Sequence, residues 1–144
     1  MQTPEEAGRN GAAKPRVLEG LVAAVCGHYP EQIAPVARLL EELGCAIRQA
    51  ESPEQLDRLL DAERIDVIFA HICPSRPRLM ALLGRTDLPP VIVLLADKDL
   101  YIETISRGAF DCLPLRPDWS ELVRVTRLAI KPRGKERQAQ AVPA

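Results

Sequence analysis

Short apolar runs alternate with segments of helical periodicity along most of this chain, and this alternation limits the folds open to it. The apolar runs fall at residues 21–26, 45–49, 67–72, 91–96 and 110–115, and between them apolar residues recur every three or four positions. The runs are typical of buried strands and the intervening segments of amphipathic helices. Because parallel strands need a crossover to return the chain to the same edge, the pattern predicts a parallel sheet with helices on both faces. We expect an α/β fold, a doubly wound five-stranded sheet built as a (βα)5 three-layer sandwich.

Several helix boundaries are marked by capping residues. One helix is expected to end at Gly44, after an apolar stripe of Ile33, Val36, Leu39, Leu40 and Leu43. The stretch "SPEQ" at 52–55 predicts the next helix start, with Ser52 as N-cap and Gln55 returning a bond to the backbone. Pro35 removes a backbone donor from the second turn of a helix that begins at Pro30, so we expect that helix to start late or to be kinked.

Composition favours one domain of balanced charge. The chain has 144 residues, of which 47% are apolar, enough for a single core. Its 20 acidic and 19 basic residues give no reason to expect nucleic acid or an anionic membrane as partner. Apolar runs of six residues fall far short of the roughly 18 needed to cross a bilayer. The ends are mixed and aperiodic, which predicts a flexible tail at 1–16, a domain at 17–131 and a second flexible tail at 132–144.

The cysteines indicate a reducing compartment. Cys26, Cys45, Cys73 and Cys112 are widely spaced without a C-x-x-C pair, and the N-terminus has no basic flank followed by an apolar core. We expect a cytoplasmic protein in which cysteines near the strands act as small apolar fillers.

From about residue 21 to residue 130 the sequence resembles the receiver domains of two-component response regulators, a bacterial phosphorelay family with a five-stranded flavodoxin-like fold. The likeness rests on "RLLEELGCAIRQAESPEQLDRLL", on "IDVIFAHICP" where the family has an aspartate-ended third strand, on "PPVIVLLAD", and on "ISRGAFDCLP" before a capped last helix. These motifs cover roughly three quarters of the chain in the right order and spacing.

The resemblance also implies where a phosphorylation pocket would lie. In the family an aspartate after strand three accepts a phosphoryl group, an acidic pair holds magnesium, a hydroxyl residue and a lysine bind the phosphate, and an aromatic residue in strand five moves with the hydroxyl residue. In this chain the phosphoacceptor position falls on His71, the acidic pair on Gly27 and His28, the hydroxyl residue on Leu95, the lysine on Leu115 and the aromatic on Cys112.

These replacements remove the chemistry of the pocket. Gly27 has no ligand atom, and imidazole suits magnesium poorly because this hard ion prefers oxygen. Leu95 and Leu115 donate no hydrogen bond and carry no charge. Without metal, hydroxyl or lysine, the electrostatic stabilisation on which phosphoryl transfer depends is lost. We therefore interpret the chain as a degenerate pseudo-receiver, without enzymatic activity or cofactor.

The leading hypothesis is a stand-alone signal-transduction module that docks to a protein partner, or to a second copy of itself, independently of phosphate. The fourth and fifth helices carry more apolar residues than one core-facing stripe needs, and the resemblance implies that these helices and the fifth strand form a docking face. The candidate interface residues are Tyr101, Ile105, Trp119 and Val123.

An alternative is a metal- or small-ligand-binding sensor. His28 and His71 are the two histidines of the chain, and both fall at the rim of the former pocket, with Cys73 as a third candidate ligand. Zinc, nickel and copper accept such donors.

Overall fold

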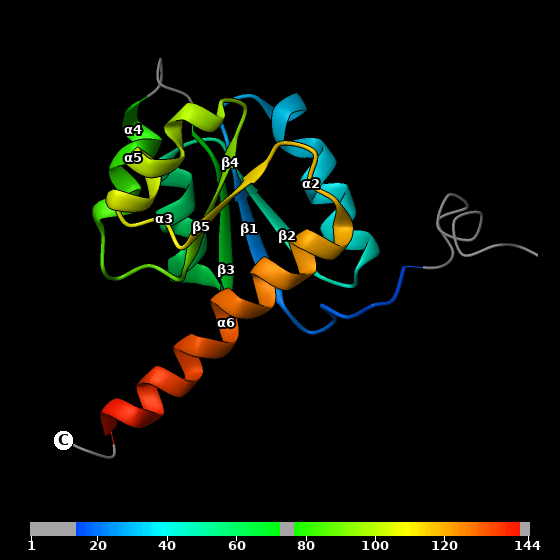
Figure 1. Ribbon diagram of the computed structural model, residues 1–144, viewed down its shortest axis with the longest axis vertical. Helices are drawn as coiled ribbons and strands as arrows, with labels where there is room; N and C mark the ends of the chain where they lie inside the picture. Colours follow the sequence, from blue (N-terminus) through cyan, green and yellow to red (C-terminus); the bar gives the residue numbers. More distant parts are fainter. Residues whose placement is uncertain (1–13, 73–76, 142–144) are drawn as a thin grey trace, which may run out of the picture.

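The computed structural model describes residues 14–72 and 77–141 and has the expected α/β architecture (Figure 1). The strands are β1 (Val22–Cys26), β2 (Ala46–Ala50), β3 (Val67–His71), β4 (Val91–Leu95) and β5 (Asp111–Pro114). The helices are α2 (Pro30–Glu42), α3 (Pro53–Ala62), α4 (Pro77–Met80), α5 (Tyr101–Ser106) and α6 (Trp119–Ala141), with short 3-10 helices η1 (Ala81–Gly84) and η2 (Lys98–Leu100). Each of the five apolar runs therefore supplies one strand.

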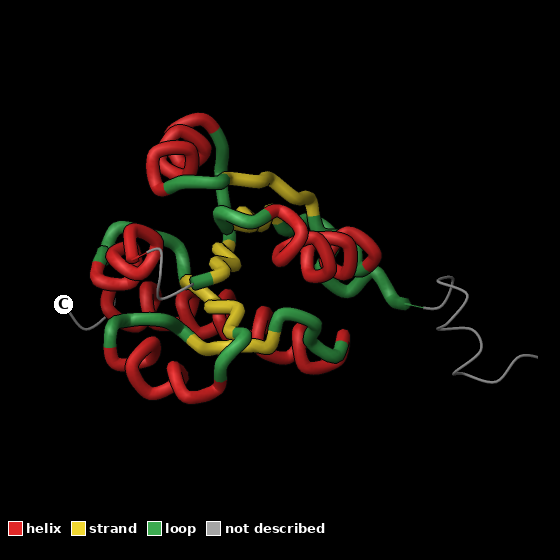
Figure 2. The backbone as a smooth tube through the Cα atoms, turned by 90° about the horizontal axis from the view of Figure 1, so that it is seen from above, coloured by secondary structure: helices red, strands yellow, loops and turns green. Residues whose placement is uncertain are grey.

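The strands form one parallel sheet in the order β2-β1-β3-β4-β5. Strand order reverses between β1 and β3, as in a doubly wound sheet. Helices α2 and α6 pack on one face, and α3, η1 and α5 pack on the other. Figure 2 shows helices on both sides of the strands. The predicted flavodoxin-like three-layer sandwich is confirmed.

The central strands are buried on both faces, which explains their continuous apolar sequences. In β1, Ala23 and Val25 belong to the layer under α2 and α6, while Ala24 and Cys26 belong to the opposite layer. Every residue of β3 and β4 is buried. Such strands cannot alternate with polar residues, because neither face meets water.

Pro35 does not delay α2, which begins at Pro30; the expectation of a late start was wrong. Pro30 stands at the first helical position, where the missing N–H costs nothing. Pro35 lies inside the helix, and the apolar stripe through Ile33, Val36 and Leu40 is fully buried. Burial of three such side chains contributes several kcal/mol, enough to offset the roughly 3 kcal/mol cost of an internal proline.

The predicted caps at Gly44 and Ser52 are confirmed. Gly44 has φ +99°, its N–H donates to the Glu41 carbonyl, and the Cys45 N–H donates to the Leu40 carbonyl, the bond pattern of a Schellman motif. Ser52 Oγ accepts from the Gln55 N–H at 3.2 Å. The Gln55 side chain accepts from the backbone N–H of Glu51, one residue before the N-cap.

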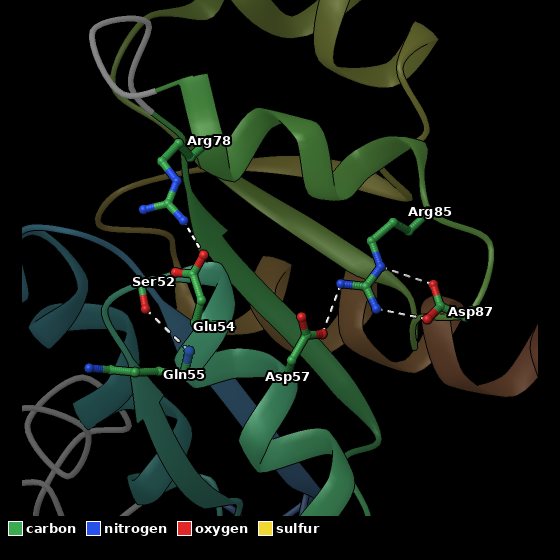
Figure 3. A network of polar contacts seen from close by, with 7 residues as sticks. All are labelled: Ser52, Glu54, Gln55, Asp57, Arg78, Arg85 and Asp87. Carbon is green, nitrogen blue, oxygen red and sulfur yellow. Dashed lines mark hydrogen bonds and ion pairs between the residues drawn. The ribbon is translucent and has the colours of Figure 1, made fainter.

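Two arginines in the connection from β3 to β4 form ion pairs with carboxylates of α3 (Figure 3). The Arg85 guanidinium donates to both carboxylate oxygens of Asp87, at 3.0 and 2.7 Å, and to Asp57 of α3 at 2.8 Å. Arg78 of α4 pairs with Glu54, at the start of α3. Because α4 and η1 are only four residues each, these pairs supply order that short helices lack.

The sequence offers Leu122, Val125, Leu128 and Ala129 as the stripe of α6 that covers the sheet, and the buried face differs from it in part. Val123 and Thr126 are buried with Leu122 and Ala129, whereas Leu128, expected in the core, is 43% exposed. Leu128 lies six residues after Leu122, about 240° further round the helix. Thr126 is tolerated in the core because its hydroxyl donates to the Leu122 carbonyl at 2.7 Å.

Helix α6 continues to Ala141, through residues that the sequence assigns to a C-terminal tail, and its end extends beyond the sheet (Figure 1). At the other end, Leu18 is buried in the core and Lys14 pairs with Glu42 of α2. The division into a domain at 17–131 and two tails stays a prediction. No helix in the described ranges is both long and apolar enough to span a membrane.

Gly108, which follows α5, is predicted to be essential for stability. It has φ +122°, and a Cβ there would lie 2.0 Å from the Leu83 carbonyl oxygen of η1. Gly108→Ala is expected to lower the free energy of unfolding by ~2–4 kcal/mol, since both the backbone conformation and the contact oppose a side chain. Urea denaturation measures the change. The control is Gly84→Ala, where the added Cβ meets no atom within 4 Å; an equal loss in both variants would contradict the prediction.

Candidate functional site at the carboxyl edge of the sheet

The sheet topology brings the predicted pocket positions to one edge. Gly27 directly follows β1, His71 ends β3, Leu95 ends β4 and Leu115 follows β5. Because the strands are parallel, their carboxyl ends meet at the same edge, where ligands of doubly wound sheets collect. The structure therefore brings these four positions to one edge of the sheet, and their role in a site stays a prediction.

His71 and Gly27 face each other across β1 and β3. A Cβ built on Gly27 would lie 3.4 Å from the His71 Cβ and 2.7 Å from Cγ2 of Ile33 in α2. The second distance is shorter than real Cβ contacts, and Ile33 is buried, so it has little room to move. Restoring an acidic residue at position 27 would therefore displace α2 core packing as well as add a charge.

The His71 side chain is largely removed from water. It is 7% exposed, and burial lowers the pKa of its imidazole below the ordinary value. A lowered pKa means that the neutral ring is favoured. The edge of β3 thus carries an uncharged group where the receiver family carries a carboxylate.

Leu95 and Leu115 are parts of the apolar layers. Leu95 is buried with the residues under α3 and α5, and Leu115 packs against the core under α2 and α6. They contribute to opposite faces of the sheet. Neither can replace the hydroxyl or the ammonium that would bind a phosphate.

The cysteines of the described chain are poor nucleophiles. Burial raises the pKa of Cys26 to about 12, and burial with the charge of Asp111 raises that of Cys112 to about 11. Because the thiolate is the reactive form, both remain thiols at neutral pH. Cys26 fits the predicted role of apolar filler, whereas Cys112 is only half-buried in β5.

The two histidines differ in environment. His28 is exposed, and its ring meets the Tyr29 ring edge-on at a centroid distance of 4.8 Å. Cys73 lies outside the described residues. In the ranges 14–72 and 77–141, no group of three or more histidine, cysteine or acidic side chains could hold a metal ion. The sensor alternative stays a prediction without a described third ligand.

Of the predicted interface residues, Val123 must be withdrawn. It is 8% exposed and packs in the core beside Leu122, because its position on α6 turns it toward the sheet. Tyr101 and Trp119 are exposed, at 44% and 38%, and Ile105 is half-buried. Ile102, at 74%, is the most exposed large apolar side chain described.

The interface residues predicted from the sequence did not include Ile102, although the apolar excess of its helix was visible in the sequence. Strands β4 and β5 and helix α5 also form a cleft that the sequence did not predict. Its residues are distant in sequence and carry no common motif.

Comparison with known proteins supports the fold. No model of a known protein family matches the sequence, and neither does any curated protein. Solved structures do match. The receiver domain of the Francisella response regulator 1452 is 21% identical, with a TM-score of 0.63 over 79% of this chain and 99% of that chain.

Two further receiver structures are similar to the same extent. The receiver domain protein from Clostridium thermocellum is 22% identical, with a TM-score of 0.67 over 79% of this chain and 97% of that chain. A response regulator from Thermotoga maritima is 24% identical, with a TM-score of 0.64 over 77% of this chain and 98% of that chain. At these identities the likeness establishes the receiver fold, and function must be argued from the residues of this chain.

The buried imidazole of His71 predicts a loss of stability in mild acid. In the unfolded chain the ring takes up a proton near pH 6.5, whereas in the folded chain its pKa is lower. The unfolded state then binds more protons, so stability is complete above about pH 6.5 and falls as the pH drops toward the folded pKa, by at most ~1.4 kcal/mol per pH unit.

Urea denaturation between pH 7.5 and pH 5.5 measures this effect. His71→Leu is expected to remove most of the loss in that range. The matched control is His28→Gln, which changes the exposed histidine and should keep it. An unchanged pH dependence in His71→Leu would refute the assignment.

Proposed function

We propose that this chain is a signal-transduction module of the receiver type that acts by protein–protein interaction and is not switched by phosphorylation. The observation that carries the proposal is the edge itself: a neutral, buried His71 ends β3, and Gly27 beside it leaves no space for a carboxylate. The receiver fold of the similar solved structures supports the general class.

Phosphoryl transfer to this edge has no electrostatic support. The reaction needs a nucleophile, a metal held by oxygen ligands, and cations or donors on the phosphoryl oxygens. Gly27, Leu95 and Leu115 supply none of these, and the lowered pKa of His71 disfavours the imidazolium that would attract a phosphate. This domain therefore transmits a signal by binding to a protein partner or to a second copy of itself.

The docking face that we propose flanks the edge strand β5. Helices α5 and α6 pack on opposite faces of the sheet beside this strand. Tyr101 and Ile102 are exposed at the start of α5, and Trp119 is exposed at the start of α6. Large aromatic and aliphatic side chains in such positions are the usual anchors of an interface.

Replacing Tyr101 or Trp119 by alanine is expected to weaken association with the partner or with a second copy. Each anchor is expected to contribute about 2 kcal/mol or more, roughly a thirtyfold change in the dissociation constant. Sedimentation velocity measures self-association, and quantitative affinity capture from the source cells measures partner binding. Addition of acetyl phosphate and magnesium should change neither.

Leu128→Ala is the matched control, because Leu128 is similarly exposed but lies about 180° round α6 from Trp119. Circular dichroism verifies that each variant is folded. The docking face is wrong if Tyr101→Ala and Trp119→Ala both associate as the wild type does. Phosphorylation independence is wrong if acetyl phosphate alters association of the wild type.

A further inference from the structure

A cleft of about 530 Å³ opens at the carboxyl ends of β4 and β5. It is lined by Leu95, Ala96, Lys98, Tyr101, Cys112 and the Leu113–Pro114 pair. Its volume lies within the roughly 300–1,000 Å³ typical of small-molecule sites. The cleft is separate from the edge between β1 and β3, where His71 and Gly27 lie.

The side chains that line the interior of the cleft are neutral and mostly apolar, and the charge of Asp111 acts on two of them, Tyr101 and Cys112. Leu95 and Leu113 are buried and form part of its wall, and the half-buried Cys112 comes from the middle of β5. The pKa of Cys112 is raised to about 11, and the nearby charge of Asp111 raises that of Tyr101, so the thiol and the phenol are both uncharged at neutral pH. A phenol ring, a proline ring and a sulfur atom are surfaces on which a flat aromatic molecule packs well.

The rim carries one cation. Lys98 is exposed, is the charged residue among those lining the cleft, and forms no ion pair with any residue in the described ranges. The neighbouring Asp97 accepts from the Asp99 N–H at 2.9 Å and caps η2. An apolar interior with a free ammonium at its mouth is complementary to a molecule with one flat apolar end and one anionic end.

We propose that this cleft binds a small aromatic carboxylate, with the ring between Tyr101, Cys112 and Pro114 and the carboxylate toward Lys98. The activity is ligand binding in a cleft that shares Leu95 and Cys112 with the positions of the former phosphorylation pocket and shares Tyr101 with the docking face. A bound ligand would contact β4, β5 and α5 at once and would stabilise the folded state.

The test uses 2-naphthoate as probe and neutral 2-naphthamide as its uncharged analogue, titrated into the full chain and followed by ¹H–¹⁵N NMR. Naphthoate is expected to give saturable shifts centred on residues 95–98, 101, 112 and 113, with naphthamide binding about tenfold more weakly. Lys98→Met should abolish the difference between the two probes. Arg127→Met, which removes an exposed charge from α6, should preserve it.

A second variant tests the cleft itself. Cys112→Phe places a ring inside it and should reduce the affinity for both probes about tenfold or more. Because Lys98 is exposed, Lys98→Met remains informative even where Cys112→Phe does not fold. The proposal is overturned if naphthoate gives no saturable shifts, if the shifts centre elsewhere, or if Lys98→Met binds naphthoate as tightly as the wild type.

Discussion

Burial of the central strands on both faces is the constraint from which the rest of this structure follows. Strands β3 and β4 have no exposed residue, so helices must cover both sides and polar chemistry is confined to the ends of the strands. The carboxyl edge is where such a sheet offers a site. In this chain the edge is itself largely apolar: Leu95 joins one layer, Leu115 packs against the other, and burial favours the neutral form of the ring that ends β3.

The apolar edge has a structural consequence as well as a chemical one. A cluster of carboxylates at a strand edge carries mutual repulsion that a bound cation relieves. Here Gly27 lets Ile33 of α2 approach the edge closely, so apolar packing occupies the space beside His71. An acidic side chain at position 27 would have to displace this packing before it could bind a metal ion. Under the proposed function, the absence of phosphoryl transfer and the tight packing of α2 are therefore coupled.

The sequence predicted what local patterns and periodicity determine. Five strands, the glycine stop at Gly44 and the serine cap at Ser52 follow from short segments and were confirmed. On α6 the predicted exposure of Val123 and the predicted burial of Leu128 were wrong. The helix has two neighbouring apolar stripes, and the sequence does not show which of them faces the sheet. The ion pairs of Arg85 and the cleft bring together residues that are distant in the sequence, so no local sequence pattern predicts them. The edge positions were located by resemblance, and their loss of function stays a proposal.

Intact-mass spectrometry after incubation with acetyl phosphate and magnesium tests the central claim most directly. The account predicts an unchanged mass for the wild type. It predicts the same for His71→Asp, because one carboxylate brings neither the metal ligands nor the cation that the reaction needs. A stoichiometric gain of one phosphoryl group by the wild type, on His71 or on another residue of the carboxyl edge, would contradict it.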